Sequence, residues 1–107
     1  MPDRELVLPI AIPQQALQQF CTRYCIRKLS LFGSVLRSDF TPQSDVDCLV
    51  EFKPDYTPTF LAIARMEREL SSLLDNRKID LRTPEELSPY FRNKVMHEAV
   101  VQYDGTR

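Results

Sequence analysis

The feature that most constrains the fold is a Gly-Ser turn that separates two apolar runs of the sequence. Residues 29–32 form the first run, which ends at Gly33-Ser34, and the second run occupies residues 46–50. A glycine at the end of a strand lets the chain turn sharply and lets backbone N–H groups approach an anion. The pattern therefore predicts two strands that meet at one tight, anion-binding turn.

Two alternating carboxylates, Asp45 and Asp47, begin the second apolar run. Successive side chains of a strand point to opposite faces, so we expect both carboxylates on one face and Val46 and Cys48 on the other. Two adjacent carboxylates repel each other unless a cation lies between them. If residues 35–37 start a helical turn, its free N–H groups also favour an anion. We interpret the combination as a site for a metal-bound nucleoside triphosphate.

The full spacing is more informative than the carboxylate pair alone, because Asp-x-Asp is common on solvated strand faces. The fixed positions are Gly33, Ser34, Ser44, Asp45 and Asp47. With each residue type at about 7% usage, chance placement is roughly 10⁻⁶ per start and roughly 10⁻⁴ over the chain. The spacing therefore argues against an accidental arrangement on a solvated strand.

With these residues in this order, the sequence resembles the minimal nucleotidyltransferases of the polymerase-beta superfamily. The resemblance covers essentially the whole chain, so residues 1–107 are expected to form one such domain. It implies a third acidic residue on a later strand, which Asp80 supplies between two apolar residues, and residues 98–103 are similar to the closing strand. Three positions depart from the usual pattern without removing a metal ligand: Leu36, Ser38 and Cys48, where a small residue, glycine and leucine are common.

The resemblance also implies roles for the acidic residues and the turn. Asp45 and Asp47 would hold Mg²⁺ or Mn²⁺, which suit hard oxygen ligands and the phosphates of ATP. Asp80 would hold the ion nearest the attacking hydroxyl and accept its proton, unless it is only a strand-edge carboxylate facing water. Gly33 and Ser34 would cradle the β- and γ-phosphates.

Two further polar residues belong to the expected nucleotide site. Arg37 would pair with phosphate or, equally well, with Asp39 at the surface. Ser44 would orient its loop or Asp45 rather than react itself.

Composition narrows the functional classes. The chain is 43% hydrophobic, with no apolar stretch near the roughly 20 residues that span a bilayer and no visible signal peptide. The net charge of −1 and the scattered basic residues make nucleic acid an unexpected substrate.

The cysteines indicate a reducing compartment. There are three, Cys21, Cys25 and Cys48, and an odd count without a disulfide framework favours reduced thiols and a cytoplasmic setting. A zinc pair at Cys21 and Cys25 is disfavoured because the one histidine, His97, lies far along the chain and is expected on a helix surface.

The periodicity predicts an α/β or α+β domain, with helices packed on a small mixed sheet. Expected helices cover residues 13–24, 59–74 and 89–98, and expected strands cover residues 28–32, 46–52, 78–81 and 100–103. Residues 83–86 read as a capping box that starts a short helical turn. The helix at 59–74 carries an apolar stripe attributed to core packing: Phe60, Ile63, Met66, Leu70, Leu73 and Leu74.

Three functions remain open at this stage. The first is an enzyme that transfers AMP from ATP to a hydroxyl; the family sharpens this to an antitoxin that adenylylates a tyrosine of an all-helical HEPN toxin. The second is a non-catalytic antitoxin that neutralises its partner by contact, which the complete carboxylate set disfavours. The third is an aminoglycoside-type nucleotidyltransferase acting on a small molecule, which the lack of a second domain disfavours.

Overall fold

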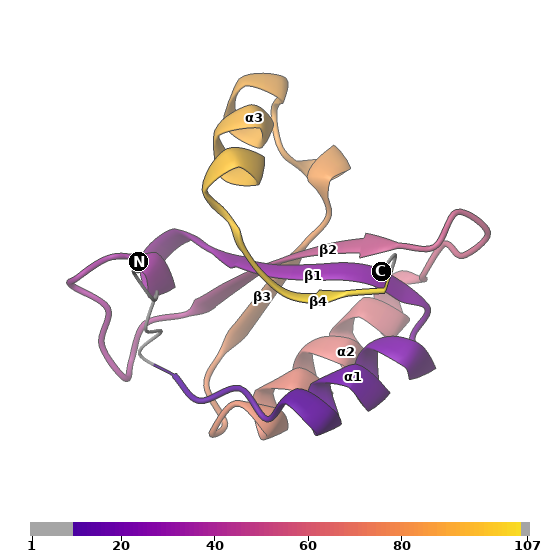
Figure 1. Ribbon diagram of the computed structural model, residues 1–107, viewed down its shortest axis with the longest axis horizontal. Helices are drawn as coiled ribbons and strands as arrows, with labels where there is room; N and C mark the ends of the chain where they lie inside the picture. The colour runs from indigo at the N-terminus through magenta and orange to yellow at the C-terminus, as the bar shows by residue number, and fades with distance from the viewer. Residues whose placement is uncertain (1–9, 106–107) are drawn as a thin grey trace, which may run out of the picture.

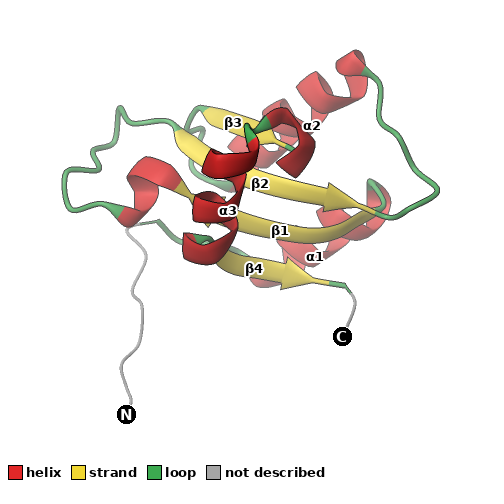
Figure 2. Cartoon of the chain, turned by 90° about the horizontal axis from the view of Figure 1, so that it is seen from above, coloured by secondary structure: helices red, strands yellow, loops and turns green. Residues whose placement is uncertain are grey.

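A computed structural model of the chain describes residues 10–105, in which a four-stranded sheet carries helices on both faces (Figures 1 and 2). The elements are α1 (Gln14–Arg23), β1 (Ile26–Phe32), the 3₁₀ turn η1 (Gly33–Leu36), β2 (Val46–Phe52), α2 (Phe60–Leu73), β3 (Ile79–Arg82), the 3₁₀ turn η2 (Pro84–Glu86), α3 (Pro89–Glu98) and β4 (Val100–Asp104). The strand order is β3-β2-β1-β4. Strand β1 runs antiparallel to β2 and β4, whereas β2 and β3 are parallel. The predicted mixed sheet is therefore confirmed.

The predicted elements are all present, with shifts of one or two residues at their ends. Strand β1 begins at Ile26, two residues before the predicted start. The capping box was wrong, because the Thr83 side chain makes no capping hydrogen bond. Instead the backbone N–H of Glu86 donates to the Thr83 carbonyl at 3.1 Å, so the segment closes as a single 3₁₀ turn.

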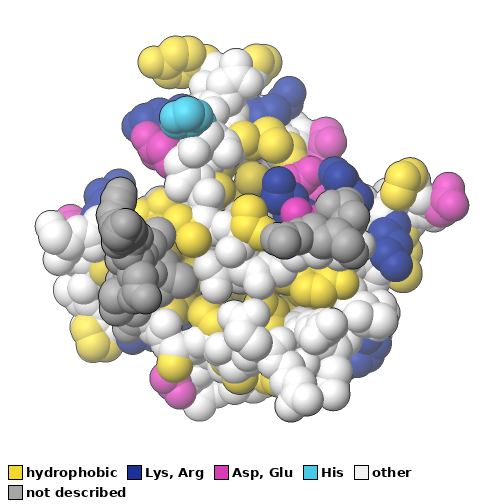
Figure 3. Space-filling view, in the orientation of Figure 1, with side chains coloured by type: hydrophobic (Ala, Val, Ile, Leu, Met, Phe, Trp, Pro, Cys, Tyr) yellow, Lys and Arg dark blue, Asp and Glu magenta, His cyan; other side chains and the backbone are white. Residues whose placement is uncertain are grey.

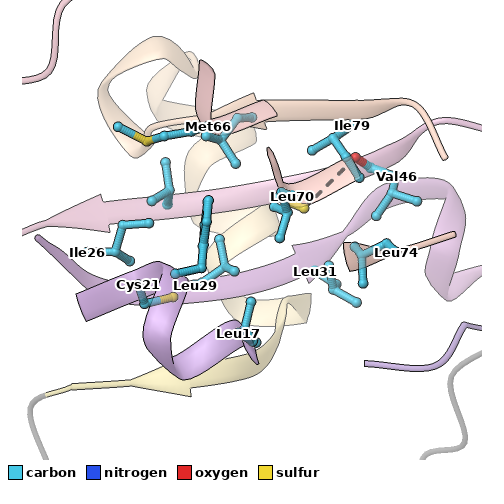
Figure 4. Close-up of a cluster of buried hydrophobic side chains, with 14 of the residues drawn as sticks. Leu17, Cys21, Ile26, Leu29, Leu31, Val46, Met66, Leu70, Leu74 and Ile79 are labelled. Carbon is cyan, nitrogen blue, oxygen red and sulfur yellow. Dashed lines mark hydrogen bonds between the residues drawn. The ribbon is translucent and has the colours of Figure 1, made fainter. Parts of the chain in front are cut away.

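Helices α1 and α2 cover one face of the sheet and form the main core with it (Figure 1). Strand alternation supplies the sheet side of this core: Val46, Cys48 and Val50 of β2 are all buried there. Figure 4 shows side chains from both helices and the strands converging in this layer. Each apolar side chain fully buried there contributes roughly 1.5–3 kcal/mol to folding.

One member of the predicted α2 stripe lies outside the core. Met66, Leu70 and Leu74 are buried, and Ile63 and Leu73 are partly buried against them, but Phe60 is 92% exposed. Phe60 is the first residue of α2, and the helix contacts the core from Ala62 onward. Among the described residues, no helix has the length and apolar character needed to cross a membrane.

Helix α3 lies on the opposite face of the sheet (Figures 1 and 2) and buries much less. Val95 of α3 packs with Phe32 and Leu49 in a second, smaller apolar cluster. The rest of this face carries the polar side chains of β2 and β3. The predicted site residues therefore lie on the less covered face.

Candidate active site

Asp47 and Asp80 face each other across neighbouring strands. They are register partners in the parallel pairing of β2 and β3, where strands lie about 4.8 Å apart. Their strand neighbours Val46, Ile79 and Leu81 point into the main core, so both carboxylates point to the opposite face. The third acidic residue that the resemblance implies therefore lies beside Asp47 of the Asp-x-Asp segment.

The pairing is electrostatically unfavourable without a cation. Partial burial raises the pKa of Asp47 above its ordinary value, and the nearby charges of Asp80 and Asp45 raise it further. A hydrogen bond from the Ser34 backbone and the charge of Arg82 oppose this rise in part. A positive ion beside Asp47 and Asp80 would relieve the repulsion.

The Gly33 turn lies directly against Asp47. Gly33 has φ +76°, a left-handed conformation that disfavours any residue with a Cβ. A Cβ at this position would also collide with the Asp47 carboxylate. The Ser34 hydroxyl donates to the Asp45 carbonyl at 3.0 Å and so ties the turn to the start of β2. Position 33 therefore requires glycine for two reasons: the left-handed backbone conformation of the turn, and the contact of that backbone with the Asp47 carboxylate.

Asp45 is placed differently from Asp47. Strand β2 begins at Val46, so Asp45 belongs to the preceding loop, and its Oδ2 lies 4.0 Å from Nζ of Lys78. Between residues 10 and 105, the structure contains no group of three His, Cys, Asp or Glu side chains close enough to hold a metal ion. The three carboxylates thus share a region without forming a closed cluster.

Asp80 has a partner that the sequence analysis did not identify. Arg82 binds it with two contacts, Nε at 3.1 Å from Oδ1 and Nη2 donating to Oδ2 at 3.2 Å. The carboxylate raises the pKa of the Arg82 guanidinium. Asp80 and Arg82 are two residues apart on one strand and therefore share a face, a relation that the sequence pattern already contained. Asp80 is therefore a half-buried carboxylate that is paired with Arg82.

The donor chemistry fits a divalent cation even though the described residues hold no three-ligand cluster. Asp47 and Asp80 offer hard oxygen atoms on one face, and their mutual repulsion favours a positive charge. Because Gly33 has no Cβ, the backbone of the turn can lie directly against the Asp47 carboxylate. Asp45 precedes the strand and has Lys78 beside it, so it is not part of this facing pair.

Ser44 and Arg37 hold the loop between η1 and β2. The Ser44 Oγ accepts a hydrogen bond from the Thr41 N–H at 3.0 Å and lies 3.2 Å from the Thr41 hydroxyl. Arg37 Nε lies 3.6 Å from Asp39 Oδ1, the surface pair that the sequence analysis left open. Arg37 also lines the depression beside Gly33, so a phosphate would have to compete with Asp39 for it.

This depression has a volume of about 540 Å³ and lies between η1 and α3. Its walls are Phe32, Gly33, Ser34, Leu36, Arg37 and Asp47 on one side and Phe91, Lys94, Val95 and Glu98 of α3 on the other. This contribution of α3 was not predicted, since the sequence pattern indicated only that residues 89–98 are helical. Only the tertiary position of α3 over β1 reveals it, since no motif links residues 91–98 to the turn.

The thiols and the histidine lie away from this chemistry. Cys21 and Cys48 are buried, and Cys25 is half-buried. Burial raises the pKa of Cys21 to about 12 and also raises the pKa of Cys48, so both are neutral thiols. His97 is exposed on α3, as expected.

Comparison with known proteins agrees with this geometry. Residues 14–101 match the model of the nucleotidyltransferase domain family. The chain is 33% identical over 78 residues to the protein adenylyltransferase MntA of Thermococcus cleftensis, covering 73% of this chain and 76% of that protein.

Solved structures show the same fold. One protein assigned as a minimal nucleotidyltransferase superposes with a TM-score of 0.67 and 32% identity, over 81% of this chain and 86% of the other. A toxin–antitoxin structure with AMP-PNP superposes with a TM-score of 0.68 over 87% of this chain and 74% of the other, at 17% identity, which supports the fold alone. With the Gly33 turn and the facing carboxylates, these matches show that the chain belongs to the nucleotidyltransferase family, as a minimal nucleotidyltransferase.

Proposed function

We propose that the chain is a metal-dependent protein adenylyltransferase, which transfers AMP from ATP to a hydroxyl of a partner protein and so acts as an antitoxin. The observation that carries the proposal is the pairing of Asp47 with Asp80 on the face beside the Gly33 turn. This arrangement brings acidic oxygens, one group of them hydrogen-bonded to the Ser34 backbone, against a tight turn of the kind that binds phosphate.

The chain's own groups have defined tasks in such a transfer. The turn at Gly33 and Ser34 holds the β- and γ-phosphates, while Ser44 and Arg37 order the loop and the phosphate side of the depression. The acceptor oxygen attacks the α-phosphorus, and the bond from that phosphorus to the β-phosphate oxygen breaks. Pyrophosphate carries away the bonding electrons, and the carboxylate of Asp80 accepts the hydroxyl proton.

The metal proposed for this site is Mg²⁺ or Mn²⁺, held by Asp45, Asp47 and Asp80. When bound, it supplies positive charge that neutralises the triphosphate and the developing charge of the leaving pyrophosphate. Lys78 and Arg82, which lie beside Asp45 and Asp80, would compete with the ion for these carboxylates.

The partner that we propose is a HEPN-type toxin with a tyrosine acceptor. Two comparisons support it: a relative named protein adenylyltransferase and a structural neighbour that is a toxin–antitoxin with AMP-PNP. The three free thiols, two of them buried and neutral, fit a reaction carried out in the cytoplasm.

One observation favours a second candidate, an antitoxin that neutralises its toxin by contact alone. Lys78 and Arg82 already compensate Asp45 and Asp80, so two of the three carboxylates have a cationic partner without any metal. Such pairing is what a purely structural acidic face would also show.

Co-expression with the toxin partner separates the two candidates. With the wild-type chain, mass spectrometry of the partner should show an added AMP, and Asp80→Asn should abolish it while the complex still forms. Full neutralisation of the toxin without any mass change, by the wild type and by Asp80→Asn alike, would establish the contact-only candidate instead.

A further inference from the structure

The depression beside Gly33 continues beyond the phosphate-binding turn to the exposed flank of α3. Gly33, Ser34 and Asp47 line one end, and Phe91, Lys94 and Glu98 line the α3 side. Its volume of about 540 Å³ lies within the range of small-molecule sites. A ligand whose phosphates lie at the turn would therefore extend along α3.

Phe91 has the character of a contact residue rather than a core residue. It is 44% exposed and belongs to neither apolar cluster of the described residues, whereas its helix neighbour Val95 is buried against Phe32 and Leu49. Figure 3 shows hydrophobic side chains exposed at the free end of α3. Exposed aromatic faces next to a phosphate-binding turn are suited to stacking on a nucleobase.

The basic group of this wall lies beside Phe91. Lys94 comes three residues after Phe91, so the two side chains share one helix face. A ligand whose base lies on Phe91 therefore has positive charge available for its phosphates.

We propose that this face of α3 is the nucleoside subsite of the enzyme, with Phe91 stacking on the base and Lys94 pairing with the phosphates. The proposal rests on the function proposed above and assigns part of the substrate to a helix outside the Gly-Ser and Asp-x-Asp motifs. A nucleotide is favoured over a segment of the partner because one continuous depression joins Phe91 to the turn.

Calorimetric titration with ATP and with inorganic tripolyphosphate, each with Mg²⁺, tests the subsite. Phe91→Ala should weaken ATP binding at least about fivefold, the lower end for loss of a base–aromatic stack, and leave tripolyphosphate binding unchanged. Phe91→Tyr should restore ATP affinity. Tyr90→Ala is the matched control, since Tyr90 is the adjacent aromatic, is 85% exposed and does not line the depression.

Four results would overturn the subsite. If the wild type binds ATP and Phe91→Ala binds it equally well, the subsite is wrong and the proposed function stands. Equal weakening of ATP and tripolyphosphate would assign the effect to the phosphate end. Loss of partner binding with normal ATP affinity would make Phe91 a docking residue. If the wild type binds no ATP with Mg²⁺, the subsite and the proposed function both fail.

Discussion

The sheet face under α1 and α2 and the face that carries α3 are built from the same strands but have opposite characters. On the first face, alternate residues of β2 are Val46, Cys48 and Val50, all buried in one apolar layer. On the second face, β2 contributes Asp47 and Glu51, and only a small cluster around Val95 is buried. In β2, therefore, the side chains on one face stabilise the fold, and the side chains on the other face are available for binding and catalysis.

This difference predicts two separable classes of mutational effect. Substitutions on the α1–α2 face should lower the free energy of unfolding without changing activity per folded molecule. Substitutions on the α3 face should change nucleotide and metal binding with little loss of stability, or even a gain, because the charges there repel each other.

The largest effect on stability is expected for Phe20→Ala in the main core. Phe20 is fully buried, so its truncation should cost roughly 3–5 kcal/mol of unfolding free energy. Phe60→Ala is the control with the same chemical change, and at 92% exposure it should alter stability by no more than about 0.5 kcal/mol. Urea denaturation of both variants measures the contrast, and equal losses would mean that the burial pattern is wrong.

The next effect concerns the turn that joins the two faces. Gly33→Val should weaken ATP binding in the presence of Mg²⁺ by at least about tenfold and reduce stability by roughly 1–3 kcal/mol, because it forces a branched residue into the left-handed region against Asp47. Ser34→Ala loses one hydrogen bond to the Asp45 carbonyl and should have a smaller effect. Unchanged ATP affinity in the glycine variant would place the phosphates elsewhere.

A third prediction uses the pH dependence of the open face. The pKa of the Asp47 carboxyl is higher in the folded state than its ordinary value of 3.8. The folded protein therefore loses stability as the pH rises from that ordinary value through the folded-state pKa, and it loses none well below pH 3.8. Asp47→Asn should therefore raise the melting temperature at neutral pH in a metal chelator. The gain should shrink as the pH falls toward the range where the wild-type carboxyl is protonated.

A melting temperature of Asp47→Asn below that of the wild type at neutral pH would contradict this reading. It would show that the hydrogen bond from Ser34 outweighs the burial and the repulsion from Asp80.

The sequence carried enough information for the strands, the mixed sheet and the approach of Asp47 to Asp80. Apolar alternation identifies which residues of β2 and β3 enter the core, and so which carboxylates point away from it. The role of Gly33 was also predictable, but for a different reason: a sharp turn directly after a strand favours glycine.

The remaining features depend on tertiary packing, which local pattern does not encode. The helical periodicity of α2 predicted that Phe60 is buried in the core, but Phe60 is exposed. Periodicity identifies the apolar face of a helix and does not identify which of its turns contact the sheet. Asp45 precedes the strand and pairs with Lys78, although alternation would have placed it in line with Asp47. The α3 wall of the depression becomes visible only when the helix is seen over β1.

The smallest expected effect is at Arg82. Its pair with Asp80 is half-exposed, so Arg82→Met should change stability by no more than about 1 kcal/mol. The same change frees Asp80 and should tighten Mn²⁺ binding several-fold, as measured by loss of the free Mn²⁺ signal in electron paramagnetic resonance. Weaker Mn²⁺ binding in this variant would instead make Arg82 a residue that positions Asp80 for the metal.

The most direct test of the account compares two carboxylates on the same face of β2, Asp47 and Glu51. The measurement is the rate of AMP transfer from α-labelled ATP to the co-purified partner, per folded molecule, for Asp47→Asn and Glu51→Gln. Asp47 faces Asp80, whereas Glu51 pairs with Arg27 at 2.7 Å. We predict at least about a hundredfold loss for Asp47→Asn and the wild-type rate for Glu51→Gln. Equal rates in both variants would contradict a catalytic centre built on the paired carboxylates of β2 and β3.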